Sequence, residues 1–149
     1  MRVAHLAFLT LISASPVIAK PVLTATCDDP KGVTFRQLRG NVEQAQDGFN
    51  DVHPVFVLDS DHKGKLLVVF GSTKPARDLG VTTQADEATI ISMSKEMITA
   101  VLASHTSSIV ETFTLFPTRG LMFYSKQLYA DIGGGLAEMT TMSAKCTFG

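Results

Sequence analysis

The sequence has no excess of charge of either sign. Its 149 residues include 13 Lys and Arg against 14 Asp and Glu, and these are spread without blocks. Such a balance leaves no basic footprint for phosphate backbones or anionic lipid surfaces, so we expect no nucleic-acid partner. The hydrophobic content of 45% at this low net charge excludes a disordered chain. The length predicts a single domain.

Long apolar runs are missing beyond the N-terminus. The best later candidate, residues 88–103, is interrupted by Lys95 and Glu96, so no transmembrane segment is expected in the mature protein. The N-terminus itself has Arg2, an apolar run over residues 6–12 and small Ala19, which is the layout of a secretory signal peptide. We therefore predict a signal peptide over residues 1–19, one domain over residues 20–149, and a periplasmic or secreted protein. A membrane anchor and a lipoprotein modified at Cys27 are the alternatives.

Cysteine is scarce: only Cys27 and Cys146 are present, near the two ends of the mature chain. In an oxidising compartment two such cysteines are expected to form a disulfide with each other. Closing so long a loop would stabilise the fold by about 4 to 5 kcal/mol in the chain-entropy model. Two free thiols or a metal pair are the alternatives, although a lone cysteine pair lacks the further ligands of a structural zinc site.

Short runs rich in β-branched and aromatic residues recur about every ten residues, separated by turn-forming clusters. One hairpin is predicted over residues 54–70 with its turn at 59–64, and a second joins residues 107–116 to 121–124. A last strand over about 138–148 would carry Cys146, and residues 33–38 form a weaker first strand. The fold class is therefore all-β or mainly β, an antiparallel sandwich or small up-and-down barrel of about seven or eight strands, with room for a short helix.

Three segments are harder to interpret. Residues 88–103 fit a broad helical face, but they also divide into two β-branched strands around Lys95 and Glu96, which we favour. Residues 37–51 are polar and are expected to form a short helix or a loop. Residues 72–87 are expected to form a long surface connection.

One short pattern is suggestive of a metal site. Asp59, Asp61 and Gly64 match the opening of an oxygen-rich calcium loop, and His62 could add a transition-metal ligand. Lys63 stands at the next ligand position, and a bidentate Glu is missing further on. We therefore favour a plain hairpin turn, keep Asp59, Asp61 and His62 as weak metal candidates, and expect no cofactor.

Catalytic motifs are also scarce. No nucleophile elbow is present, and His53 and His105 are the histidines that could act as a general base in a small hydrolase. Glu111 and Glu138 could form a catalytic pair if they faced one cavity. Strand alternation instead favours an outward, solvated position for both. The catalytic residues are thus unknown.

A set of large side chains in the C-terminal half could either line a ligand cavity or fill a core, and we favour the core. Its members are Phe113, Phe116, Phe123, Tyr124, Tyr129, Met122, Met139 and Met142.

Residues 98–102, with the sequence Ile-Thr-Ala-Val-Leu, and residues 112–120, with the sequence Thr-Phe-Thr-Leu-Phe-Pro-Thr-Arg-Gly, carry a resemblance. In this C-terminal half the chain resembles small exported proteins of Gram-negative bacteria that have no assigned function. The resemblance implies a periplasmic address and a β-rich fold held by a terminal disulfide, and it transfers no catalytic residue. We expect a non-enzymatic module that binds a small molecule or an envelope protein. A small hydrolase and a metal-binding module are the alternatives.

Overall fold

The computed structural model describes residues 21–70, 85–104, 108–131 and 135–149. The predicted signal peptide, most of the expected connection 72–87, and His105 lie outside these residues. The described chain forms one ten-stranded antiparallel sheet. Its strands are β1 (Pro21–Cys27), β2 (Lys31–Leu38), β3 (Asn41–Gly48), β4 (Val55–Asp59), β5 (Lys65–Val69), β6 (Asp86–Met93), β7 (Ile98–Ser104), β8 (Ile109–Phe116), β9 (Leu121–Ala130) and β10 (Leu136–Phe148), with a 3-10 turn, η1 (Pro117–Arg119), between β8 and β9.

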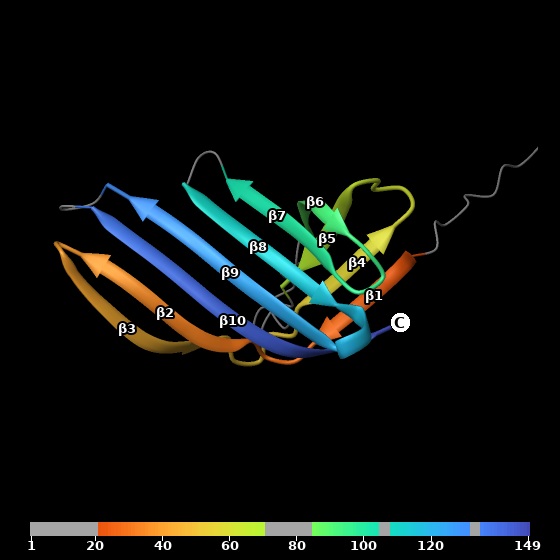
Figure 1. Cartoon of the computed structure of the whole chain (residues 1–149), viewed down its shortest axis with the longest axis horizontal. Coiled ribbons are helices and arrows are strands. Elements are labelled where there is room, and N and C mark those ends of the chain that lie inside the picture. Colours follow the sequence, from red (N-terminus) through yellow and green to blue (C-terminus); the bar gives the residue numbers. More distant parts are fainter. Residues whose placement is uncertain (1–20, 71–84, 105–107, 132–134) are drawn as a thin grey trace, which may run out of the picture.

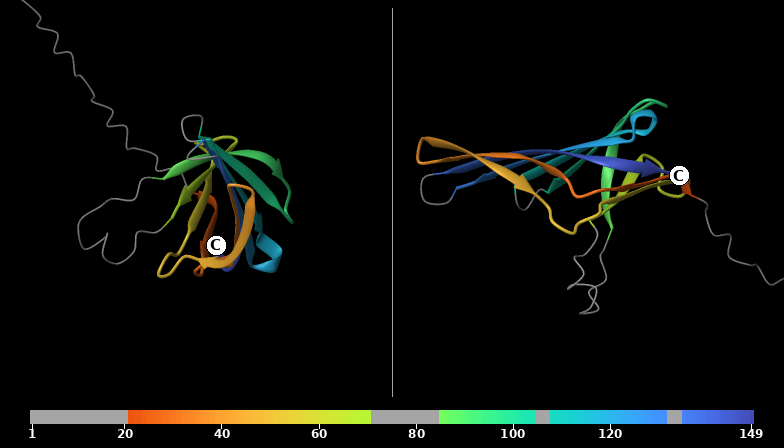
Figure 2. Two further views of the ribbon diagram at one scale, coloured as in Figure 1. Left: turned by 90° about the vertical axis from the view of Figure 1, so that its left-hand side faces the viewer. Right: turned by 90° about the horizontal axis from the view of Figure 1, so that it is seen from below.

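Eight of the strands close into a barrel. The order β1-β4-β5-β6-β7-β8-β9-β10 returns to its start because β10 also pairs with β1. The hairpin β2–β3 is additional, and β2 pairs with the first part of β10. Figure 1 shows β2, β3, β9 and the first part of β10 extending beyond the strands β1 and β4, which run across them. We call this extension, made of β2, β3, residues 136–143 of β10, residues 125–130 of β9 and residues 109–112 of β8, the arm. Figure 2 shows its length relative to the barrel.

Strand β10 changes partner along its length. Residues 136–143 pair with β2, whereas residues 146–148 pair with β1. Just before this change, β2 and β10 approach each other closely at Gly32. A Cβ atom on Gly32 would lie 1.8 Å from the carbonyl oxygen of Thr141, which no side chain can accept. Glycine at this position therefore allows the sheet to run continuously from barrel to arm.

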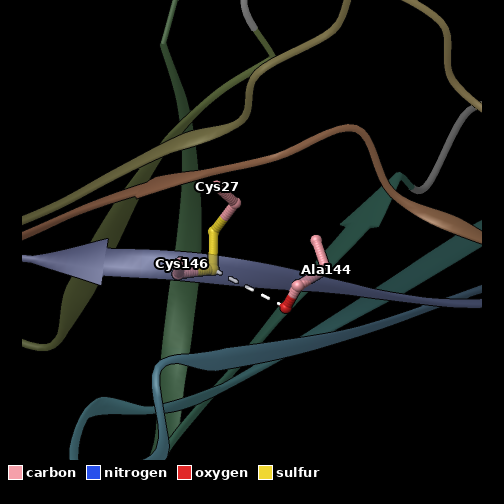
Figure 3. The surroundings of a disulfide bond; sticks show 3 residues. All are labelled: Cys27, Ala144 and Cys146. Carbon is pink, nitrogen blue, oxygen red and sulfur yellow. Dashed lines mark hydrogen bonds between the residues drawn. A yellow bond between two sulfur atoms is a disulfide. The ribbon is translucent and has the colours of Figure 1, made fainter.

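The seam between β1 and β10 is short and covalently linked. Three residue pairs form it, among them Cys27 opposite Cys146, and the two cysteines form a disulfide with a Cα–Cα distance of 4.0 Å. Figure 3 shows this bond joining the two strands. Beyond it, Thr24 and Gly149 exchange backbone hydrogen bonds of 3.0 Å. The sequence-based prediction of the pairing is confirmed.

The barrel interior is filled by side chains. Alternate residues of each strand point inward, as period two requires, and Phe56, Phe113 and Leu66 are fully buried there. The ring centroids of Phe56 and Phe113 lie 5.7 Å apart in an edge-to-face arrangement.

Both predicted hairpins and the last strand are confirmed, and of the two proposed architectures the barrel is the right one. Residues 88–103 form a strand pair, β6 and β7, rather than a helix. The prediction for residues 37–51 is wrong, because most of this polar segment is strand β3. Strand β1 was also missed, but the barrel has eight strands, as predicted, and the hairpin β2–β3 adds two more to the sheet. No helix among the described residues is long and apolar enough to cross a membrane.

Candidate functional site

The predicted metal candidates lie in the turn between β4 and β5. Asp59 Oδ1 accepts hydrogen bonds from the backbone amides of Asp61 and His62 at 2.8 and 2.9 Å, and His62 Nδ1 lies 3.0 Å from both carboxylate oxygens of Asp59. The hydrogen bond with His62 lowers the pKa of Asp59, and the same bond raises the pKa of His62. Asp59 is therefore engaged in shaping the turn. Within the described ranges, no three His, Cys, Asp or Glu side chains are grouped to hold a metal ion.

His53 stands next to one carboxylate. Its Nδ1 lies 3.9 Å from Asp29 Oδ1, and its side chain is 61% exposed. The Asp29 carboxylate accepts hydrogen bonds from the backbone amides of Asp51 and Val52 at 3.1 and 2.9 Å. No hydroxyl group of the described chain is hydrogen-bonded to His53, so the structure does not assemble the three groups of a hydrolytic triad around this residue.

Glu111 and Glu138 do not point outward, so the expectation for both side chains is wrong. In register, Phe113 of β8 faces Tyr124 of β9, and both are buried inside the barrel. Glu111 lies two residues before Phe113 on β8, and Glu138 lies four residues before Met142, the partner of Tyr124, on β10. Because side chains alternate between the faces of a strand, both glutamates lie on the inner face of the sheet where it leaves the barrel. Only 11% of the Glu138 side chain is exposed.

The two glutamates belong to a row of alternating charges across the inner face of the arm. Glu111 of β8 is the register partner of Lys126 of β9, whose Nζ lies 3.6 Å from Glu138 Oε1 of β10. Arg36 of β2 donates two hydrogen bonds to Glu138 Oε2, at 2.9 and 2.7 Å. Arg36 in turn stands opposite Glu43 of β3. The row therefore runs acid, base, acid, base, acid over five neighbouring strands, and we call it the charge ladder.

Tyr124 marks the boundary between the apolar barrel and the charge ladder. Its ring packs against Phe113 and Phe70, with centroid distances of 5.4 and 5.8 Å, and its hydroxyl donates a 2.5 Å hydrogen bond to Glu111. Burial of the phenol, and then the Glu111 carboxylate, raise the pKa of Tyr124 far above its usual value. The phenol therefore stays protonated and serves as a hydrogen-bond donor.

A second polar group bridges three strands of the arm. The hydroxyl of Thr34 on β2 hydrogen-bonds the Asp47 carboxylate on β3 and lies 2.7 Å from the hydroxyl of Thr140 on β10. The hydrogen bond from Thr34 lowers the pKa of Asp47. An open pocket of about 210 Å³ lies along this face, between Thr34, Arg36, Glu43 and Asp47. Thr34, Asp47 and Thr140 are therefore joined in one hydrogen-bonded group, whereas the Glu43 carboxylate stands at the margin of the same face.

The outer face of the arm is apolar by comparison. Register pairing places Phe35 of β2 beside Met139 of β10. Val42 of β3 is the register partner of Gln37, which lies two residues after Phe35 on the same face of β2. These three residues line an open groove of about 370 Å³ with Ala137. Val42 is 68% exposed and Met139 is 42% exposed. Large exposed hydrophobic side chains in a shared groove are typical of a surface that contacts another molecule.

Most of the large C-terminal side chains lie in one of two locations, and Phe116 is half-buried with its ring centroid 5.6 Å from that of Phe123. Inward positions are buried in the barrel, as expected for a core. Phe123, Tyr129 and Met139 are instead exposed on the outer face, where the expectation of a core position is wrong. The buried members are Phe113, Met122, Tyr124 and Met142.

Strand β3 is the outer strand of the arm. It pairs with β2 on one side, and no other described strand pairs with its second side. Its exposed residues include Glu43, which ends the charge ladder on the inner face, and Val42, which lines the apolar groove on the outer face. One sign of this strand is visible in the sequence, because the dipeptide Arg39-Gly40 separates two short segments and can form the turn of a hairpin.

Comparisons of the chain with protein-family models, with curated proteins and with solved structures find no match in any of the three. The geometry of the arm thus provides the basis for a functional conclusion.

Proposed function

We propose that this chain is an exported, non-enzymatic binding protein whose arm recognises another protein. The observation that carries the proposal is the arm itself, a sheet extension with an apolar groove on its outer face and the unpaired side of β3 at its margin. The barrel acts as the support. Placing a recognition surface on a rigid sheet reduces the entropy lost on binding.

A protein partner is favoured over a small molecule by the filling of the barrel. Small ligands are usually held in concave sites that bury most of their surface. Here the interior positions are taken by Phe56, Phe113 and their neighbours, and the described pockets on the arm are open. An open, partly apolar groove that adjoins charged side chains suits a macromolecule better.

Export is supported by the N-terminal sequence and by the disulfide. A bond between Cys27 and Cys146 persists in oxidising compartments such as the periplasm. The resemblance of the C-terminal half to small exported proteins of Gram-negative bacteria points the same way. Intact-mass analysis of the protein recovered from its producing cells should give a chain that begins at Lys20.

The binding role can be tested by site-specific photo-cross-linking in the producing cells. A benzophenone amino acid replaces Val42 on the arm or, as a matched control, Val22 on the barrel, because the two side chains are 68% and 67% exposed. We expect a discrete protein adduct from position 42 that excess unmodified protein suppresses and that position 22 does not give. Equal adducts at both positions, or a small molecule retained by the purified protein in native mass spectrometry, would contradict the proposal.

A further inference from the structure

We propose that the free side of β3 binds an extended segment of the partner as an additional antiparallel strand, with basic residues of that segment facing Glu43 and Asp47. The proposal rests on the function proposed above and specifies the partner's chemistry. Strand addition of this kind obtains affinity from main-chain hydrogen bonds and specificity from alternate side chains.

The backbone of β3 is arranged to accept such a strand. The hairpin β2–β3 turns through two residues, Arg39 and Gly40, both at positive φ, and Leu38 stands opposite Asn41. In an antiparallel ladder closed in this way, the amides and carbonyls of alternate residues point toward the partner strand and the rest point away. Counting from the closing pair, the backbone groups of Val42, Gln44 and Gln46 point away from β2.

The charge ladder indicates what an added strand should carry on the inner face. Its alternation runs through Glu111, Lys126, Glu138 and Arg36, and it ends on the acid Glu43 at the margin of the sheet. Opposite charges on neighbouring strands stabilise a sheet, and like charges directly opposite each other destabilise it. The next strand therefore continues the ladder best with Lys or Arg opposite Glu43.

The same reasoning gives apolar residues on the outer face of the added strand. Residues of β3 that point their backbone toward the new strand carry their side chains on the outer face, where Val42 adjoins the groove lined by Phe35 and Met139. An antiparallel partner places side chains of its own hydrogen-bonded residues on this face. The segment should therefore alternate basic residues, facing inward, with apolar residues, facing outward.

A second copy of the chain fits this side of β3 less well. Two β3 strands related by a two-fold axis must place residues of the same face opposite each other. Centring the pair on Ala45 sets Glu43 opposite Asp47 of the second copy, and centring it on Glu43 sets Glu43 opposite itself. A pair centred on Gln44 avoids these contacts, but it offers no cation to either carboxylate.

The test uses synthetic peptides and the purified full chain. The probe is a capped, fluorescent seven-residue peptide that alternates Val and Lys, and the matched control has Glu in place of Lys. We expect the Lys peptide to bind about fivefold or more tightly than the Glu peptide at low salt, from opposite rather than like charges across the strands. Equal affinities would overturn the proposal.

Two N-methylated versions of the Lys peptide test the backbone pairing without altering the protein. Methylation of the Val amides removes the donors that face β3, and should weaken binding roughly tenfold or more. Methylation of the Lys amides affects the opposite side of the peptide, and should leave affinity nearly unchanged. If both methylated peptides bind like the parent, strand addition is wrong.

Protein variants locate the contact. Gln44→Pro removes an amide that points away from β2 and should abolish peptide binding, whereas Gln44→Thr keeps the amide and should bind like the original. Glu43→Lys should reverse the preference, so that the Glu peptide binds more tightly. Circular dichroism confirms the folding of each variant, and the peptide series remains decisive if Gln44→Pro does not fold.

The same materials separate this proposal from the proposed function. If cross-linking from position 42 gives a protein adduct that the Lys peptide does not suppress, strand addition at β3 is wrong and the binding function stands. If sedimentation shows a dimer of the full chain that Gln44→Pro dissociates, the occupant is a second copy and the proposal is overturned. Suppression of the adduct by the Lys peptide alone supports both proposals.

Discussion

Glu138 of β10 accepts two hydrogen bonds from Arg36 of β2, at 2.7 and 2.9 Å, although the two residues are 102 positions apart in the sequence. Lys126 approaches the same carboxylate from β9 on the other side. Glu138 is therefore the centre of the charge ladder, and it ties together three strands of the arm. The contacts of this carboxylate make the hairpin β2–β3 part of one surface with the barrel strands.

Replacement of Glu138 by Gln should destabilise the protein by about 1 to 2 kcal/mol, because it leaves two cations facing a neutral group at a mostly buried position. Urea denaturation followed by circular dichroism measures the change. Glu96→Gln is the control, since the Glu96 side chain is 59% exposed and its contact with Lys95 is at the surface. Exposed pairs of this kind contribute little, so the control should change stability by less than about 0.5 kcal/mol. Equal effects of both substitutions would show that the charge ladder is not a stabilising feature.

Gly32→Ala should destabilise the fold by more than about 2 kcal/mol, because the added Cβ would overlap backbone atoms of Thr141 and one of the strands must move. Gly48→Ala is the matched control on the neighbouring strand. Its Cβ would meet the flexible side chain of Lys31 at 2.8 Å, which can move aside, and the Pro30 carbonyl oxygen at 3.0 Å, which is tight but far less severe than the 1.8 Å contact at Gly32. Thermal unfolding of both variants checks the difference, and a Gly32→Ala protein as stable as the control would contradict the close approach of β2 and β10.

The pair formed by Asp59 and His62 should give stability a specific pH dependence. The pKa of His62 is raised above 6.5 in the folded state, so its stabilising contribution is fully present below that pH and is lost as the pH rises through the folded-state pKa. The pKa of Asp59 is lowered below 3.8, so its contribution is present above that value and is lost as the pH falls. The pair is thus most favourable between these two limits.

His62→Gln should therefore reduce the decline in melting temperature as the pH rises above 6.5. The decline in melting temperature at acid pH, which other carboxylates cause, should remain. Melting temperatures of the original protein and the variant, measured from pH 5 to pH 9, give the comparison. His53→Gln is the control, because His53 lies 3.9 Å from its nearest carboxylate oxygen and its side chain is 61% exposed. An unchanged slope in His62→Gln would mean that the turn does not hold the charged pair.

The barrel could be predicted from the sequence because its strands carry strong local signals. The hairpin of β4 and β5 has apolar runs on both sides of a turn rich in Asp and Gly, and β8 alternates with period two. The disulfide followed from the number of cysteines and the expected compartment. The hairpins depend on residues that are close together in the sequence. The disulfide depends on a reaction for which the chain offers a single pair of cysteines.

The arm could not be predicted in the same way. Strand β3 has the sequence Asn-Val-Glu-Gln-Ala-Gln-Asp-Gly, in which Val42 is the one large apolar residue, so neither hydrophobic periodicity nor strand propensity marks it. It is a strand because β2 provides a paired backbone along its whole length and because Thr34 of β2 hydrogen-bonds Asp47 of β3. The inward position of Glu138 depends on cations contributed by two other strands, and the single-strand pattern contains no sign of them.

Reduction of the disulfide should affect the barrel seam before the arm. The bond joins residues separated by 119 positions, so its loss should cost about 5 kcal/mol in the chain-entropy model. The seam itself contains three register pairs, whereas β10 pairs with β2 and β9 over its preceding residues. In hydrogen exchange, the Cys27→Ser, Cys146→Ser protein should therefore lose protection first in β1 and at residues 146–148, while residues 136–143 stay protected. Uniform loss along the whole of β10 would instead show that barrel and arm unfold as one cooperative unit, and would rule out the arm as a surface that persists when the seam opens.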